Sequence, residues 1–177
     1  MKNLLITLLL VSFSVDTNAQ SSRNVEDHQV QFGLPIPAIL YEKGIGKNTT
    51  LSVEALTGFQ IRNSEYGVYP ILRGQYRYYY NMKRRLDKKK NISGNSGNYV
   101  GALMLYQDGN SLFGNLNTTS TLAVGPVYGL QRTYRSGFFY RLETGLAYFE
   151  DDAFNKGNGI ALILAARIGW VLGRKRK

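Results

Sequence analysis

The chain of 177 residues contains no cysteine and only one histidine, His28. Without cysteine it has no disulfide scaffold, no thiolate metal site, no cysteine nucleophile and no acylated cysteine of a lipoprotein. One histidine leaves no material for a metal site built from several imidazoles. These absences exclude several classes of enzyme and metalloprotein, and the length suggests one domain preceded by a removable leader.

Long apolar runs are also scarce. The apolar segment 4–11 follows Lys2 and precedes the small or polar residues Thr17-Asn18-Ala19. It is too short for the ~20 residues of a membrane-spanning helix, so we predict that residues 1–19 are a secretory signal peptide, cleaved before Gln20. No later segment approaches a membrane-spanning helix. A mature chain of this kind enters a membrane only as a closed set of strands.

Glycine and tyrosine are plentiful, with 19 and 13 residues. After a polar lead-in over 20–29, apolar and polar residues alternate with the period of β-strands. Strands are predicted near residues 30–43, 49–62, 66–81, 98–107, 119–133, 137–149 and 159–172. An eighth strand is expected because bacterial membrane barrels have even strand numbers. It lies either within 28–37, where Pro35 and Pro37 mark a bend, or within 111–116.

The two faces of these strands differ in a way that indicates the environment of the protein. One face is large and apolar with aromatic residues toward the strand ends, whereas the other is small or charged. A soluble barrel would carry many polar residues on its outer face, but glycine and alanine suit the crowded interior of a small barrel. We therefore predict an all-β fold, a small closed antiparallel transmembrane β-barrel of eight strands over 30–173 with a polar, packed lumen.

Charged residues on the small face are nearly balanced in sign. Because buried charges are tolerated only when they are paired and hydrogen-bonded, we predict a salt-bridge network that fills the lumen. Its members are Glu54, Arg73, Arg77, Arg141, Glu143 and Arg167. The alternative is that these are solvated residues on the outside of a soluble barrel. A lumen filled in this way is too crowded for a general diffusion pore.

The net charge of +10 is concentrated in two segments. Residues 83–90 carry a net charge of +5 and the C-terminal tail 174–177 carries +4, so the rest of the chain is close to neutral. The first segment is either a solvated loop or a contact for anionic groups of lipopolysaccharide, of other outer-membrane lipid or of an envelope polymer. The residues predicted for this contact are Lys83, Arg84, Arg85, Lys88, Lys89 and Lys90. Nucleic acid is not an expected partner, because the signal peptide exports the chain.

Several segments resemble a known group of proteins. Residues 77–85, RYYYNMKRR, together with 90–93, 96–99 and 125–132, resemble stretches in small uncharacterised outer-membrane β-barrel proteins of Bacteroidetes-type bacteria. The resemblance implies a fold and a location, the outer membrane of a Gram-negative bacterium, but no reaction. One feature departs from the usual pattern, in which the last strand ends on an aromatic residue. Here seven residues follow Trp170.

The sequence therefore predicts a monomeric outer-membrane protein with a structural, adhesive or surface-binding role and no catalytic site, cofactor or metal. Two alternatives stay open. One is a secreted or periplasmic ligand-binding barrel of lipocalin type. The other is a lipid-A-modifying outer-membrane enzyme, in which His28 would be the base or Glu54 and Glu143 would act as acid–base partners. If the C-terminus is periplasmic, the position of the eighth strand decides on which side of the membrane the basic segment lies.

Overall fold

The computed structural model describes residues 23–151 and 157–172, so the predicted signal peptide and the basic tail lie outside the described residues. The strands are β1 (His28–Leu34), β2 (Ala38–Gly44), β3 (Thr49–Arg62), β4 (Glu65–Tyr78), β5 (Asn98–Gln107), β6 (Phe113–Gly114), β7 (Thr121–Thr133), β8 (Phe138–Asp151) and β9 (Gly157–Leu172). One short helix, α2 (Met82–Asp87), follows β4.

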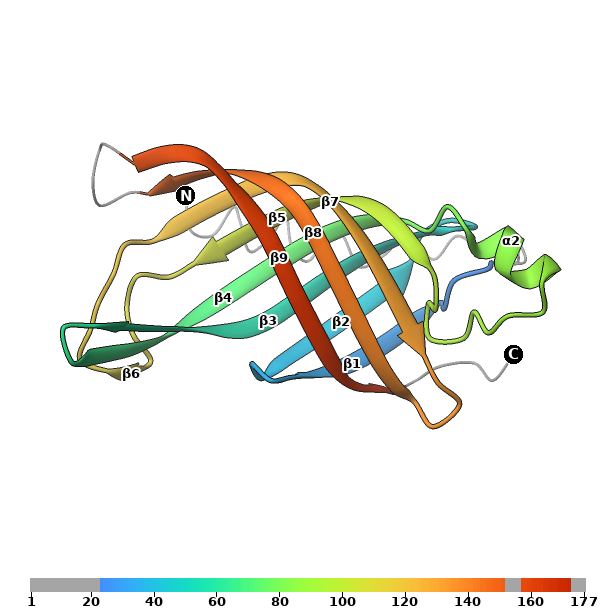
Figure 1. Cartoon of the computed structure of the whole chain (residues 1–177), viewed down its shortest axis with the longest axis horizontal. Coiled ribbons are helices and arrows are strands. Elements are labelled where there is room, and N and C mark those ends of the chain that lie inside the picture. The colour runs from blue at the N-terminus through green and yellow to red at the C-terminus, as the bar shows by residue number, and fades with distance from the viewer. Residues whose placement is uncertain (1–22, 152–156, 173–177) are drawn as a thin grey trace, which may run out of the picture.

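Eight of these strands form a closed, antiparallel, hydrogen-bonded ring (Figure 1). The order around the ring is β1, β2, β3, β4, β5, β7, β8 and β9, and β9 returns to β1 through pairs from Val30↔Leu172 to Leu34↔Ile168. The two-residue β6 pairs with β4 outside this ring. The predicted all-β, antiparallel architecture and the expected eight-strand count are confirmed.

The eighth strand comes from the first of the two predicted regions. The segment 30–43 was expected to be one strand, but it forms β1 and β2 with a turn at residues 35–37 between them. Pro35 and Pro37 lack the backbone N–H that a continuous ladder needs, and their fixed φ favours a turn. The other candidate region, 111–116, contributes only β6. The remaining predicted strands agree with the observed bounds to within three residues.

The even number of ring strands brings both described ends of the chain to one end of the ring. We call this the terminal end. It carries residues 23–27, the turns 45–48 and 134–137, and the long connection 79–97 with α2. The opposite end, which we call the hairpin end, carries the tip of β3 and β4, whose mutual pairing continues as far as Arg62↔Glu65 (Figure 1). The basic segment 83–90 therefore lies at the same end as Leu172.

Side chains alternate between the two faces of each strand, as a period of two requires. In β3, Thr50, Ser52 and Glu54 are buried inside the ring, whereas Leu51 and Val53 on the outer face are 50% and 48% exposed. Most large apolar side chains of the ring thus lie outside and the charged ones inside, although Leu40, Leu103 and Phe139 are also buried. Within the described ranges, no helix is long and apolar enough to cross a membrane.

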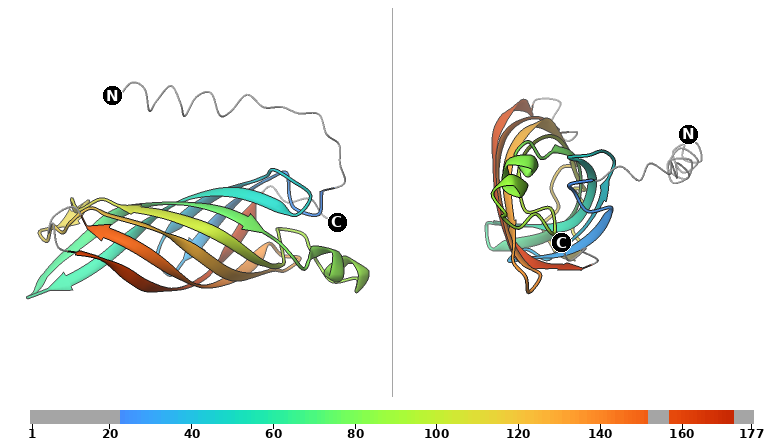
Figure 2. Two further views of the ribbon diagram at one scale, coloured as in Figure 1. Left: turned by 90° about the horizontal axis from the view of Figure 1, so that it is seen from above. Right: turned by 90° about the vertical axis from the view of Figure 1, so that its right-hand side faces the viewer.

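The terminal end of the ring is covered by two segments of the chain. A buried apolar cluster contains Val25, Tyr79, Met82, Ile92 and Tyr99. The backbone N–H of Glu26 donates to the side chain of Asn95 at 2.7 Å, and the Glu26 carboxylate accepts from the N–H of Gly94 at 2.8 Å. In the view from this end, α2 and the chain around it lie in front of the ring opening (Figure 2). These contacts tie the first described residues to the loop 91–97.

Candidate functional site

The six residues predicted for the interior network all lie inside the ring. Each is at most 6% exposed. They come from four strands: Glu54 from β3, Arg73 and Arg77 from β4, Arg141 and Glu143 from β8, and Arg167 from β9. The pair β3 and β4 is not adjacent to the pair β8 and β9 in the ring. Contacts between the two pairs therefore cross the interior.

Glu54 is shared by three guanidinium groups. Arg141 Nη2 lies 2.6 Å from Glu54 Oε1, and Arg167 Nε lies 3.3 Å from the same oxygen. Arg73 Nη1 is 3.4 Å from Glu54 Oε2. A buried carboxylate is stable only when such partners replace its hydration. Three strands thus converge on one acidic side chain.

Glu143 forms the second centre of the network. Its carboxylate accepts hydrogen bonds from Arg73 Nη2 at 2.7 Å, from Gln75 Nε2 at 2.9 Å and from the Tyr99 hydroxyl at 2.6 Å. Because Arg73 also contacts Glu54, it joins the two carboxylates into one network.

Glu42 is a third carboxylate of the interior, which the sequence analysis missed. It is fully buried and accepts hydrogen bonds from Gln29 and Thr50 at 2.5 Å and from Tyr79 at 2.9 Å. Burial and the charge of Glu42 raise the pKa of the Tyr79 hydroxyl well above its ordinary value, so this hydroxyl remains a donor. One continuous strand over 30–43 would place residue 42 on the face opposite residue 31. Pro35 and Pro37 were the signal in the sequence that a turn separates two strands, so that the inward-facing positions change from odd to even numbers.

Arg77 connects Glu42 to the rest of the interior. It is fully buried, and its terminal nitrogens lie 3.4 Å from Glu42 and 3.9 Å from Glu143. Its Nε donates to Gln75 at 2.7 Å, and the guanidinium stands 5.0 Å from the centre of the Tyr99 ring. The seven charged residues of this network, four arginines and three glutamates, therefore have a net charge of +1.

The six basic residues predicted for anion contact differ in their exposure. Lys83, Arg84, Lys88, Lys89 and Lys90 are exposed. Lys83 pairs with Asp87 at 3.2 Å, a solvated ion pair of the kind that stabilises little. Arg85 is different, because it is half-buried and folds back onto the loop 91–97, donating to the carbonyl of Asn91 at 2.7 Å.

The residues considered for catalysis are engaged in other contacts. His28 lies exposed at the start of β1, where its Nδ1 is 2.6 Å from the Tyr41 hydroxyl and the two rings stack. Glu54 and Glu143 are occupied by arginines. Across residues 23–151 and 157–172, no three His, Asp or Glu side chains are grouped so that they would hold a metal ion.

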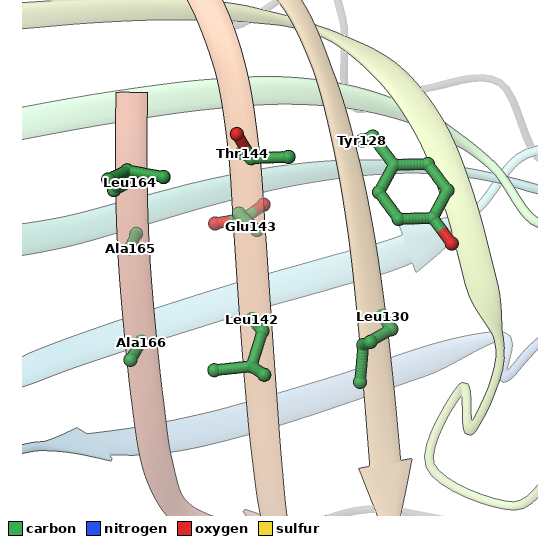
Figure 3. Close-up of a pocket in the computed structure, with 8 residues that line it drawn as sticks. All are labelled: Tyr128, Leu130, Leu142, Glu143, Thr144, Leu164, Ala165 and Ala166. Carbon is green, nitrogen blue, oxygen red and sulfur yellow. The ribbon is translucent and has the colours of Figure 1, made fainter. Parts of the chain in front are cut away.

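The outer wall contains a shallow apolar hollow of about 520 Å³ over β7, β8 and β9 (Figure 3). Leu142, Leu164 and Tyr128 border it, and Leu164 is 73% exposed. Ala165 and Ala166 are also among its lining residues. This part of the wall offers an apolar, uneven surface to whatever surrounds the ring.

Comparison of the chain with protein-family models, with curated proteins and with solved structures gives no significant match. The functional assignment therefore depends on the geometry of the ring, above all on the polarity of its two faces.

Proposed function

We propose that this protein is a small monomeric β-barrel of a Gram-negative outer membrane, with a structural, adhesive or surface-binding role. The observation that carries the proposal is the inverted polarity of the ring, with charges inside and large apolar side chains outside. The Leu, Ile and Val side chains that are about half exposed or more include Leu51, Val53, Leu72, Val124, Leu146, Ile160, Leu162 and Leu164. Water-soluble monomers rarely expose apolar patches larger than a few hundred Å², whereas lipid stabilises such a surface.

Aromatic side chains at both ends of the apolar wall support the same proposal. At the terminal end, Phe138 and Trp170 meet edge to face with ring centres 5.8 Å apart. Toward the hairpin end, Tyr66, Tyr106 and Tyr148 are exposed. Membrane barrels carry aromatic girdles at the two interfaces of the bilayer. The five longest strands have 13 to 16 residues, more than the ~9–11 that a tilted strand needs to span the bilayer; they are β3, β4, β7, β8 and β9. Strands β1 and β2 are shorter, with seven residues each.

The interior supports a role other than that of a general pore. Arg141–Glu54 and Arg73–Glu143 contacts of 2.6 and 2.7 Å join opposite walls of the barrel. A small barrel filled by its own side chains leaves no wide aqueous channel. The same filling argues against a lipocalin-type cavity, whose walls would be apolar on the inside.

The hairpin end supports the adhesive or surface-binding role. Here β3 and β4 continue beyond their other partners, and Phe59 and Ile61 are exposed. Phe113 of β6, which pairs with β4, is 70% exposed. If the chain termini face the periplasm, this end faces the outside of the cell. Its apolar side chains would then meet external surfaces or molecules.

Cell fractionation tests the proposal. The full chain is produced in a Gram-negative host, and its soluble fraction, inner membrane and outer membrane are separated. We expect the protein in the outer membrane, resistant to extraction by urea, with a heat-dependent change of mobility on gels. Recovery from the soluble fraction without detergent would contradict the proposal. Turnover of purified lipopolysaccharide, lost in His28→Ala, would show that the protein is an enzyme.

A further inference from the structure

A second polar site lies at the terminal end, apart from the interior network. It is a pocket of about 300 Å³ between α2, the loop 91–97 and the β7–β8 turn. Three arginines and two tyrosines contribute to its lining: Arg85, Arg132, Arg135, Tyr134 and Tyr140. Arg85 is distant in the sequence from Arg132 and Arg135, and only the fold brings it to the same cavity.

The base of this pocket is fixed by hydrogen bonds. The side chain of Asn91 donates to the carbonyl of Thr133 at 2.6 Å, and the N–H of Thr133 donates to Ser96 Oγ at 3.3 Å. Arg85 donates to the carbonyl of Asn91 at 2.7 Å and to Ser96 Oγ at 3.3 Å. The loop, the end of β7 and Arg85 are thus held together before any ligand arrives.

Arg85 and Arg132 are positioned by neutral acceptors. Arg132 donates to the carbonyl of Gly97 at 3.0 Å and to the side-chain oxygen of Asn98 at 2.6 Å. In the part of the chain that the structure describes, no carboxylate pairs with Arg85 or Arg132. Burial and the positive charge of Arg132 lower the pKa of the Arg85 guanidinium. Their like charges repel each other, and a bound anion would relieve that repulsion.

The position of the pocket indicates where such an anion would come from. The Tyr134 ring is tilted against those of Phe138 and Tyr140, with ring centres 6.0 and 6.4 Å apart, and Phe138 contacts Trp170. The pocket therefore adjoins the aromatic cluster of the terminal end. Aromatic residues of this kind lie at the level of lipid headgroups in a membrane barrel. Arginine side chains bind phosphate through paired, charge-assisted hydrogen bonds.

We propose that this pocket binds the phosphate group of a glycerophospholipid in the leaflet next to the terminal end, an inference that rests on the proposed membrane location. Arg85, Arg132 and Arg135 supply the positive charge, and the tyrosines border the acyl-chain side. Of the six basic residues first predicted for anion contact, only Arg85 takes part. The other five, all exposed on or after α2, are not needed.

Lipid retention in native mass spectrometry tests the proposal. The full chain, purified in neutral detergent, is mixed with dioleoylphosphatidylglycerol, with dioleoylglycerol, which lacks the phosphate, or with inorganic phosphate. We expect selective retention of the phospholipid. Loss of one charge-assisted hydrogen bond in Arg85→Gln or Arg135→Gln should weaken it roughly tenfold or more. Arg84→Gln is the matched control, because it removes the same charge from an exposed position on the same helix.

Three outcomes would overturn the proposal. In the first, both pocket variants retain the phospholipid as well as Arg84→Gln does. In the second, dioleoylglycerol is retained as well as the phospholipid. In the third, equimolar inorganic phosphate displaces the lipid, which would make a free anion the occupant. Because retention is measured in detergent, it is scored independently of cell fractionation. A protein found in the soluble fraction would contradict the proposed membrane location. Loss of phosphate selectivity alone would contradict only the proposed phospholipid pocket.

Discussion

Glu54→Gln is the substitution that tests the interior network most sharply. The wild-type carboxylate is shared by Arg73, Arg141 and Arg167 at 3.4, 2.6 and 3.3 Å. The amide removes the negative charge without changing the volume, so the net charge of the seven interior residues rises from +1 to +2. Removing one partner of a buried ion pair costs about 3–5 kcal/mol, because the other charge stays buried. For a domain of this size, that loss lowers the melting temperature by roughly 6–20 °C.

The assay is thermal unfolding in neutral detergent, followed by circular dichroism and by the heat-dependent gel shift. Glu65→Gln makes the same chemical change at an exposed residue near the tip of the β3–β4 hairpin and serves as the control. Replacing Arg167 with methionine in the Glu54→Gln background removes the excess charge and should restore part of the stability. Equal melting temperatures for Glu54→Gln and Glu65→Gln would refute the reasoning, and so would a double variant that is less stable than Glu54→Gln alone.

Two further substitutions test other parts of the fold. Tyr79→Phe removes one hydrogen bond to the buried Glu42 and should lower the free energy of unfolding by about 1–3 kcal/mol. Tyr80→Phe, which is exposed, is its control, and equal stability of the two variants would count against a structural role for the bond. Gly169→Ala should prevent closure between β9 and β1, because a Cβ there would overlap the backbone oxygen of Phe32. Gly74→Ala is the control, because a Cβ at position 74 would meet no atom closer than 4.0 Å. If both variants keep the compact, heat-modifiable gel band equally well, the result would contradict the tight pairing of β9 with β1.

Much of the strand pattern could be predicted, because alternation is a local property of the sequence. The segments 49–62 and 98–107 agree residue for residue with β3 and β5. The division of 30–43 was only one of two alternatives for the eighth strand, because both halves alternate, but in opposite phase. Glu42 was missed because the segment was first treated as one strand. Helix α2 was not expected either, since its six residues are too few to show a helical period.

The partners within the site could not be predicted, because they depend on how the ring closes. Strand register makes Arg73 the direct neighbour of Glu54, yet the shortest contact of Glu54 is to Arg141 from the opposite wall. The pocket of Arg85, Arg132 and Arg135 joins a helix after β4 to the β7–β8 turn. In the sequence, Arg85 belonged to a basic run, and nothing local separated it from its neighbours.

The central claim is that the outer face of the ring contacts lipid, and spin labelling along β9 tests it most directly. The chain has no native cysteine, so single cysteines at Leu162 and Leu164, which point outward, and at Ala165 and Arg167, which point inward, each carry one label. In isolated cell membranes, we predict that the labels at 162 and 164 collide with oxygen more often than with a water-soluble nickel complex, whereas the inward labels do not. Outward labels that collide mainly with the nickel complex would place this face in water and contradict the account.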